Sequence, residues 1–482
     1  MESILALPFF EELLKWTTQA NGFLWGTKFL IPLLCGTGIF FTLRLGFVQV
    51  SKFGMACRKL FGSFSLFGEA AGKSGMSSFQ ALTTAIAAQV GTGNLVGAMT
   101  ALVTGGPGAI FWMWVAAFFG MATNFGEACL AQLYKEEDET GQVVGGPAYY
   151  ISRGLGNGPV AKFLAGFFAV AIILALGFMG NMVQANSISD AFKNAFDIDQ
   201  VVVGIGLAVI AGAIFMGGVK RIAAVTEKLV PVMAILYMAA GLALIVMNAS
   251  HIPTVFAQIF SCAFSAKAVW GGAAGAGVQF AVATAARYGI ARGLFSNEAG
   301  MGSTPHAHAV AKVNHPVEQG VLGVIAVFID TFVVLNITIF TVMSSGILDT
   351  NFNEKGEPIK KGIALVQEAF KAHFMGEFGY TFIAICLLFF AFSTIIGWYY
   401  FGETNIRYLF GAKGLLPYQL IVVLCILTGS CLKIDLVWEL TDFFNGIMVI
   451  PNLIALLLLS GKVAQLLREY NEGKPFDRNR LL

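Results

Sequence analysis

Ser78 to Val103 reads SFQALTTAIAAQVGTGNLVGAMTALV, and this stretch is the strongest indication of the fold. It has the length and composition of a membrane-spanning helix, except for Gly91-Thr92-Gly93-Asn94 near its middle. Glycine leaves a helix readily, so the tetrapeptide predicts an unwound segment between two half-helices. An unwound backbone at membrane depth needs protein or a water-filled cavity around it, which indicates a binding site there. The alternative is helix–helix packing through small residues.

The composition of the whole chain is that of a membrane protein. Of its 482 residues, 57% are hydrophobic and 12% are charged, against about a quarter charged in a soluble domain. The apolar runs reach roughly 20 residues, enough to cross a bilayer. We therefore expect an all-α membrane protein with the lipid bilayer as a partner. The basic residues are scattered, so no nucleic acid is expected, and the seven dispersed cysteines indicate neither a disulfide framework nor a metal site.

Hydropathy predicts eleven membrane-spanning segments. They cover residues 22–48, 78–103, 108–133, 161–187, 201–218, 223–247, 280–313, 320–345, 378–401, 417–432 and 436–459.

An odd number of crossings places the two termini on opposite sides of the membrane. One side, with the C-terminal tail, carries 19 of the 30 Lys and Arg residues, and the other carries 9. Because basic residues concentrate in cytoplasmic loops, we expect a multi-pass protein of the plasma (inner) membrane. Its N-terminus lies outside and its C-terminus in the cytoplasm. The polar outer segment 347–379 is expected to form a short helical cap over an outer vestibule.

The seventh span repeats the pattern of the second. A half-helix (279–294) is followed by a break at Phe295–Gly302, a half-helix of roughly ten residues and a proline turn. The two broken spans are five apart, so they lie inverted in the membrane, as in inverted-repeat secondary transporters. Two breaks in corresponding positions favour a binding site over packing. We expect an extra helix and loop (1–74), two five-helix repeats (75–250 and 251–465) and a tail (466–482).

Two acidic residues fall within the predicted spans. Glu298 lies in the second break and Asp330 near the middle of the next span. Acids inside a membrane are costly and are usually functional. We expect Glu298 to be a structural partner of Arg287 or Arg292 rather than a direct ligand. Asp330 is interpreted as an internal hydrogen-bonding residue in preference to a coupling-ion ligand.

Several motifs carry a resemblance to a known family. GGPGAIFWMWV (105–115), GLFSNEAG (293–300) and FST (392–394) with Trp398 resemble the signatures of the alanine or glycine:cation symporter family. This family of sodium:alanine symporters belongs to the amino acid–polyamine–organocation superfamily. The similarity runs from GTGIF (36–40) to the eleventh span. It implies sodium-driven transport of alanine or glycine on the ten-helix core of neurotransmitter:sodium symporters, with one extra N-terminal helix.

An amino acid offers the site a carboxylate and an ammonium group. Free backbone amides at a half-helix N-terminus suit the carboxylate, and carbonyls or a side-chain amide suit the ammonium. A small apolar pocket would select a methyl side chain. The candidate substrate-binding residues are Thr92, Gly93 and Asn94 for the carboxylate, Asn297 for the ammonium, and Gly177, Phe178, Phe295 and Trp398 for the pocket. The alternative for Trp398 is a place in an interfacial aromatic belt.

The expected cofactor is Na⁺. By resemblance to the second sodium site of the related symporters, the ion would bind the carbonyls of Ala87 and Val90 and the hydroxyls of Ser393 and Thr394. The alternative is that both hydroxyls bond back to carbonyls of their own helix. Asn94 resembles the asparagine of a first sodium site, and could contact substrate instead.

The sequence does not predict an enzyme. It holds no Ser-His-Asp, Walker or dinucleotide fingerprint in a fitting context, and the glycine-rich run 271–277 lacks a P-loop lysine. His306 and His308 are two apart and share no helix face, so they are interpreted as gate or loop residues. One rival is a proton-coupled transporter of the same fold with Glu298 or Asp330 as carrier. A channel or a membrane-embedded enzyme is the other alternative.

Overall fold

The structure, a computed structural model, describes residues 8–26, 28–62, 76–264, 268–270, 278–280, 282–353, 358–432 and 435–482. These residues form helices and two short antiparallel strand pairs. β1 (Glu136–Glu137) pairs with β2 (Val143–Val144), and β3 (Ala268–Trp270) pairs with β4 (Val278–Phe280). The predicted all-α class is confirmed.

The helices of the first half follow the predicted order. They are α2 (Pro8–Leu24), α3 (Leu30–Arg44), α4 (Val48–Ser51), α5 (Phe53–Gly62), α6 (Ser78–Gln89), α7 (Ala98–Gly105), α8 (Gly108–Leu133), α9 (Pro147–Gly154), α10 (Pro159–Ile172), α11 (Asn181–Phe196), α12 (Gln200–Phe215) and α13 (Gly218–Met247). The second half contains α14 (Ile252–Phe264), α15 (Val282–Asn297), α16 (Pro305–Ala309), α17 (Pro316–Phe328), α18 (Asn336–Ser344), α19 (Gly362–Phe370), α20 (Phe378–Phe410), α21 (Leu415–Cys431), α22 (Asp435–Asn471) and α23 (Arg478–Leu481).

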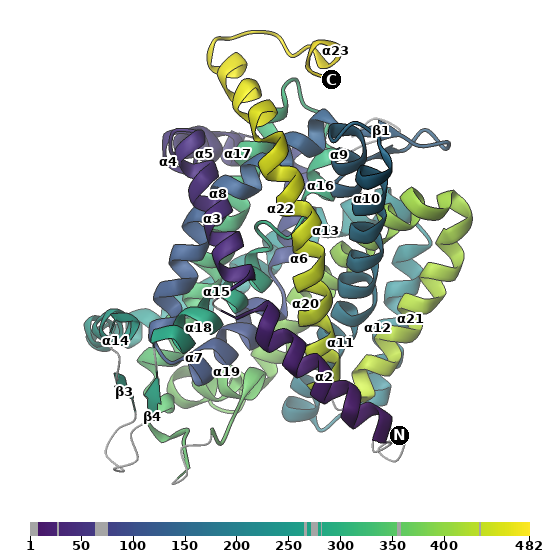
Figure 1. Cartoon of the computed structure of the whole chain (residues 1–482). Helices are drawn as coiled ribbons and strands as arrows, with labels where there is room; N and C mark the ends of the chain where they lie inside the picture. Colours follow the sequence, from purple (N-terminus) through teal and green to yellow (C-terminus); the bar gives the residue numbers. More distant parts are fainter. Residues whose placement is uncertain are drawn as a thin grey trace.

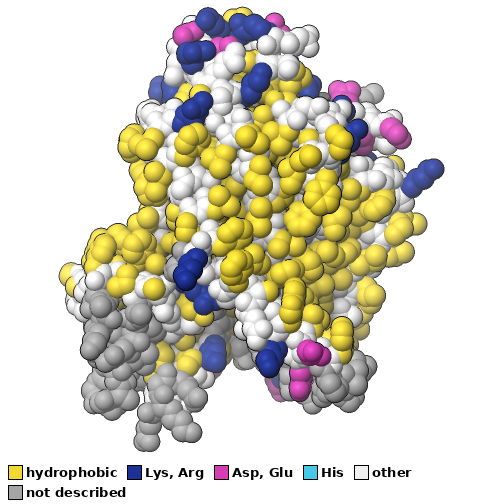
Figure 2. Space-filling view, in the orientation of Figure 1, with side chains coloured by type: hydrophobic (Ala, Val, Ile, Leu, Met, Phe, Trp, Pro, Cys, Tyr) yellow, Lys and Arg dark blue, Asp and Glu magenta, His cyan; other side chains and the backbone are white. Residues whose placement is uncertain are grey.

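Most of these helices run between two opposite ends of the molecule, which carry the two termini (Figure 1). We call the end with α2, α7 and α19 the N-terminal face and the end with α9, β1 and α23 the C-terminal face. In the view of Figure 2, hydrophobic side chains cover the middle height, and most charged side chains lie near the two ends. This distribution is the one expected of a membrane-spanning bundle.

Six helical stretches in the described residues are long and apolar enough to cross a membrane, and a bent pair makes up to seven. The bent pair is Ser78–Gln89 with Gly93–Gly105, and α3 and α12 are shorter apolar helices. The count of eleven spans and the division into two five-helix repeats stay predictions.

The predicted first span, 22–48, is wrong. α2 ends at Leu24 and a separate helix, α3, begins at Leu30. Tertiary hydrogen bonds hold the chain at this turn. The side-chain amide of Asn21 donates to the carbonyl of Glu439 on α22 (2.7 Å), and the indole of Trp25 donates to the carbonyl of Asp442 (3.0 Å). Hydropathy cannot detect such bonds.

Of the four π-helical turns in the described residues, three interrupt helices in the interior, and the other, Lys371–Met375, follows α19. The three interior turns cover Gly93–Gly97, Ile173–Gly180 and Ile329–Leu335. Such turns are rare and are frequent at functional sites. The first follows the predicted break at Gly91, and the third carries Asp330. The irregular backbone is thus concentrated at the middle of the bundle.

Candidate functional site

The first predicted break is confirmed. α6 begins with a capping box, in which Ser77 and Gln80 exchange hydrogen bonds of 3.1 Å, and it ends at Gln89. The axis bends by 45° before α7 continues. Close packing is a second reason for the glycines. A Cβ on Gly91 would lie 2.3 Å from the hydroxyl oxygen of Thr394, and a Cβ on Gly93 would lie 2.9 Å from the Cα of Ser296.

The second break exists, with boundaries that differ from the prediction. α15 continues through Phe295 and Asn297, and the chain leaves the helix at Glu298, whose φ is +56°. The half-helix that follows, α16, has 5 residues rather than the roughly ten predicted. Gly300 and Gly302 also have positive φ values, +82° and +81°. This break is thus a longer loop than the first.

Glu127 on α8 supports this loop. Its carboxylate accepts hydrogen bonds from the backbone amides of Gly300 (3.1 Å) and Gly302 (2.9 Å), and from the side-chain amide of Asn452 on α22 (2.7 Å). Because buried unwound amides need acceptors, Glu127 is part of the site. Sequence reasoning missed it, although a glutamate inside the apolar span 108–133 was a signal for it.

Asp330 connects the two breaks. Its carboxylate accepts hydrogen bonds from the side-chain amide of Asn94 (2.7 Å) and from the hydroxyls of Ser296 and Thr331 (3.0 Å each). All four residues are fully buried. The prediction of internal hydrogen bonding for Asp330 is confirmed. A second link joins the breaks where the side-chain amide of Gln89 donates to the carbonyl of Asn297 (2.7 Å).

The expected pairing of Glu298 with Arg287 or Arg292 is wrong. Glu298 accepts hydrogen bonds from the indole of Trp398 and the hydroxyl of Ser303. Arg292 instead forms two hydrogen bonds with Asp442 on α22 (2.7 and 3.0 Å), and Arg287 lies over the ring of Tyr288. The positive φ of Glu298 ends α15 at this residue, and its carboxylate meets Trp398 and Ser303 instead of the two arginines.

The four predicted sodium ligands lie together. The Thr394 hydroxyl oxygen is 2.9 Å from the carbonyl oxygen of Ala87 and 3.3 Å from that of Val90, and the Ser393 hydroxyl oxygen is 3.3 Å from the carbonyl of Ala87. Both hydroxyls also donate to the carbonyl of Phe390 in their own helix (2.8 and 3.1 Å). Carbonyls freed by an unwound helix, with nearby hydroxyls, are the donor set that binds Na⁺ in inverted-repeat transporters.

Two of the predicted substrate groups are engaged inside the protein. The backbone amide of Thr92 donates to the side-chain oxygen of Gln184 (3.1 Å), and that of Asn94 donates to the carbonyl of Gly91 (3.3 Å). The prediction of free amides at Thr92 and Asn94 is therefore wrong. The side chain of Asn297 is also engaged, since it donates to Thr331 and accepts from the amide of Ala299.

Four other buried polar atoms, on the first break, at the end of α6 and on α11, have no hydrogen-bond partner among the described residues. Leaving a buried polar group unpaired is costly, so such atoms indicate room for a polar ligand. Gln184 was missed in the sequence, although a glutamine within the apolar span 161–187 was a signal for it. The four atoms are Oγ1 of Thr92, Nε2 of Gln184, Oε1 of Gln89 and Oδ1 of Asn181.

Aromatic side chains lie next to these groups. The rings of Phe295 and Trp398 meet edge to face with centroids 6.0 Å apart, and Trp398 is 2% exposed. Gly180 on the preceding π-turn faces Trp398, because a Cβ there would lie 2.6 Å from the indole. Gly177 and Phe178 instead pack against Tyr418 of α21. The prediction that Gly177 and Phe178 line the pocket is therefore corrected, and Gly180 is the residue that lies beside Trp398.

The two faces of the molecule differ in access to the breaks. A cavity of about 640 Å³ on the N-terminal face reaches Val96, Thr100 and Arg292 on the half-helices, and Lys361–Ala364 at the start of α19 line it. On the C-terminal face, the amide of Met76 donates to the carbonyl of Val310 and the amide of Lys312 donates to that of Met76 (3.0 Å each). These bonds join the ends of the two broken helices on that face.

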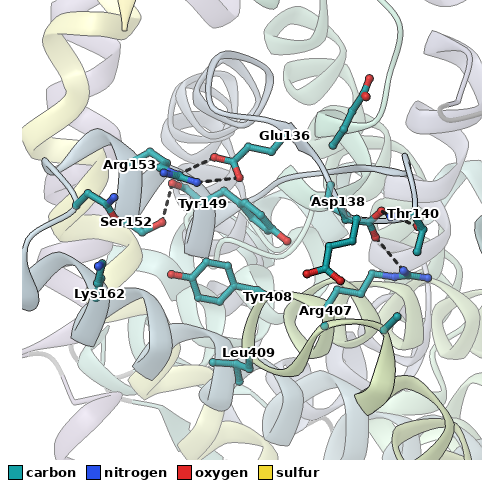
Figure 3. A pocket seen from close by; sticks show the side chains of 16 residues that line it. Glu136, Asp138, Thr140, Tyr149, Ser152, Arg153, Lys162, Arg407, Tyr408 and Leu409 are labelled. Atoms are coloured by element: carbon teal, nitrogen blue, oxygen red, sulfur yellow. Dashed lines mark hydrogen bonds and ion pairs between the residues drawn. The ribbon is translucent and has the colours of Figure 1, made fainter.

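A second cavity of about 640 Å³ lies on the C-terminal face, away from the breaks (Figure 3). Its charged side chains are largely paired: Arg153 with Glu136 (2.7 Å), and Arg407 with Asp138 (2.9 Å). Burial would raise the pKa of Asp138, but its hydrogen bonds and the charge of Arg407 outweigh burial and hold that pKa below the usual value. The two ion pairs bind the β1–β2 hairpin to α9 and to the end of α20.

Comparison with known proteins gives a family match, relatives that align over most of the chain and a similar fold. Residues 10–480 match the sodium:alanine symporter family. The chain is 42% identical to the sodium/alanine symporter AgcS of Methanococcus maripaludis (94% of this chain, 96% of that protein) and 42% identical to the probable sodium/glutamine symporter GlnT of Bacillus subtilis (94% and 90%). The crystal structure of MhsT in complex with L-phenylalanine has a similar fold, with a TM-score of 0.58 at 14% identity over 81% of this chain and 90% of MhsT.

Proposed function

Because the chain belongs to the sodium:alanine symporter family, we propose that it imports alanine or glycine with Na⁺ by alternating access. The observation that supports this most directly is the meeting of two broken helices at Asp330, beside buried polar atoms that lack partners. Inverted-repeat transporters place their sites in such a position. The family is one of transporters, so no catalytic reaction is proposed.

In this proposal the cation site consists of the oxygens of Ala87, Val90, Ser393 and Thr394. A bound sodium ion would supply positive charge to carbonyls that the end of α6 leaves without helical partners. These groups belong to α6 and α20, so occupation of the site favours the arrangement in which the two helices are in contact. That arrangement also positions Thr92 and Gln184.

The substrate site lies between the first break, α11 and α20. The unpartnered Nε2 of Gln184 and the hydroxyl of Thr92 can donate to the substrate carboxylate. The backbone amide of Gly93 stays a proposed donor to the carboxylate, and its missing side chain lets the first break approach Ser296. The rings of Phe295 and Trp398 limit the size of the substrate side chain.

The direction of transport follows from the predicted topology. The N-terminal face is proposed to lie outside, so the vestibule under α19 receives external substrate. The C-terminal face is proposed to be cytoplasmic, and the Met76 bonds close it in this conformation. Movement of the two five-helix repeats, 75–250 and 251–465, relative to each other would then open one face of the transporter and close the other.

Removal of sodium tests the coupling. Since the cation site and Thr92 share one unwound segment, binding of either ligand favours the other, and this coupling is reciprocal. We expect alanine affinity to fall about tenfold or more when choline replaces sodium, a coupling of roughly 1.4 kcal/mol. Binding to protein in nanodiscs measures this. Equal affinity in the two salts would contradict the proposal.

Gln184→Ala tests the substrate site. The variant removes a donor to the substrate carboxylate, and hydrogen bonds to charged groups contribute about 1.5–3 kcal/mol. We expect the KM for alanine to rise about tenfold while the sodium dependence stays. Ser189→Ala on the same helix is the matched control, because within the described residues its hydroxyl bonds to Ala185 of that helix alone. A KM unchanged in Gln184→Ala would remove this residue from the site.

Proton coupling is the second candidate. Glu127, Glu298 and Asp330 are fully buried, and no ion pair with Lys or Arg involves them in the part of the chain that the structure describes. A carboxylate without a cationic partner is a possible proton carrier. A pH jump across a proteoliposome membrane without sodium separates the two candidates, since only proton coupling would then drive uptake.

A further inference from the structure

The chain returns to the protein after its last long helix. α22 ends at Asn471, and Asp477 caps the short helix α23 by accepting a hydrogen bond from the amide of Asn479 (3.0 Å). Leu481 of α23 is fully buried. Figure 1 shows this segment at the end of the molecule that carries the C-terminus. We call residues 472–482 the C-terminal strap.

Arg478 attaches the strap to α8. Its guanidinium donates to the carbonyl of Leu133 (2.9 Å) and to that of Lys135. These carbonyls lie at the C-terminal end of a 26-residue helix, where no helical donor is available and the helix dipole is negative. An arginine fork that bonds two such carbonyls fixes the strap in position.

The end of α8 in turn holds the closure between the broken helices. The ammonium of Lys135 donates to the carbonyl of Ala311 (2.9 Å), and the side-chain amide of Gln132 donates to the same carbonyl (2.9 Å). Ala311 forms the β-bridge with Met76, which is the proposed closure of the C-terminal face. Arg478 therefore acts on the closure through one intermediate segment, residues 132–135.

A second set of contacts reaches the linker between α16 and α17. The ring of Phe476 in the strap lies 5.6 Å from that of His315, and Tyr470 of α22 lies 4.9 Å from it on another side. Arg480 pairs with Glu469 on α22 (2.6 Å). The strap thus contacts both α8 and the segment that continues the second broken helix.

We propose that the C-terminal strap is a latch that holds the C-terminal face closed and so restrains the opening of the transporter on that side. Opening requires Met76 to separate from residues 310–312, and the strap stabilises the segments that keep them joined. Only the transport readout of this proposal rests on the proposed function. The latch itself is a property of the fold and can be measured without substrate.

Hydrogen exchange of the full-length protein in nanodiscs tests the latch. The amides of Met76 and Lys312 form the closure, so peptides that contain them report its opening. We expect these peptides to exchange roughly tenfold faster in Arg478→Ala and in a chain that ends at Glu472. Peptides from α12, which lies away from the strap, should be unchanged. Wild-type exchange rates in both variants would overturn the proposal.

Two further variants serve as controls for this experiment. Lys474→Ala removes the same charge from the strap at an exposed residue whose ion pair is with neighbouring Glu472, and it should exchange like the wild type. Arg478→Lys keeps the charge but loses the fork, so it should open the closure even if Arg478→Ala fails to fold. If the wild type does not take up alanine, the proposed function fails while the exchange result stands. Uptake with no change in exchange defeats the latch alone.

Discussion

Gly91→Ala is expected to abolish sodium-driven alanine uptake, with a loss of about 100-fold or more in kcat/KM. The added Cβ would lie 2.3 Å from the hydroxyl oxygen and 3.0 Å from the Cβ of Thr394. Rotation of the hydroxyl alone does not relieve the second contact, so α20 must move away from the first break. That movement separates Thr394 from the carbonyls of Ala87 and Val90, and both proposed binding sites lose their geometry.

Gly97→Ala is the matched control for this variant. Gly97 lies in the π-turn that directly follows Gly91, but the nearest atom to an added Cβ is the carbonyl oxygen of Thr92 at 3.8 Å, an ordinary contact. Initial rates of labelled alanine uptake into proteoliposomes compare the two variants, and thermal stability in detergent separates misfolding from lost transport. A Gly91→Ala protein that transports as well as Gly97→Ala would refute the close approach of α6 and α20 as a requirement.

Thr394→Val is expected to lower the apparent sodium affinity by about ten- to hundredfold, with little change in the order of preferred amino acids. Valine has nearly the shape of threonine but no hydroxyl, so it removes one oxygen from the proposed cation site without opening a large cavity. The hydroxyl bridges Ala87 and Val90 at 2.9 and 3.3 Å, and its loss also loosens that turn. Hydrogen bonds of charged groups contribute about 1.5–3 kcal/mol, which corresponds to the stated range.

Thr394→Ser keeps the hydroxyl and serves as the control. It should retain sodium activation close to that of the wild type, because only a methyl group is lost. The concentration of sodium that gives half-maximal uptake, measured at saturating alanine, decides the result. If Thr394→Val needs no more sodium than Thr394→Ser, the hydroxyl does not belong to the cation site.

The failed site predictions have a common cause. The need to compensate a buried charge suggested Arg287 or Arg292 as the partner of Glu298, but Arg292 bonds to Asp442, which is 150 residues away in the chain. The end of the first half-helix suggested that the backbone amide of Thr92 is free, but this amide donates to the side-chain oxygen of Gln184 on α11. In each case the actual partner comes from another helix. A single sequence gives no measure of which helices adjoin or which of their faces meet.

The wall of the pocket formed by the fourth predicted span shows the same limit on a smaller scale. Gly177 and Phe178 were predicted to line this wall because they lie midway along that span. The π-turn Ile173–Gly180 adds residues to the helix path and rotates the following face, so Gly180 meets Trp398. No residue pattern distinguishes a π-turn from an α-helical turn of the same apolar composition.

The sequence by itself determined the membrane class and the two helix breaks, and its motifs indicated the family and, by resemblance to that family, the grouping of Ala87, Val90, Ser393 and Thr394. These features depend on local composition and short motifs: apolar runs too long for anything but a bilayer, and glycines that release the helix. Tertiary structure alone decided how Asp330 joins the breaks, which side chains occupy the freed amides, and how the C-terminal strap reaches α8. Each of these is a contact between distant segments, and buried polar groups in a membrane must find such partners wherever the packing of whole helices places them.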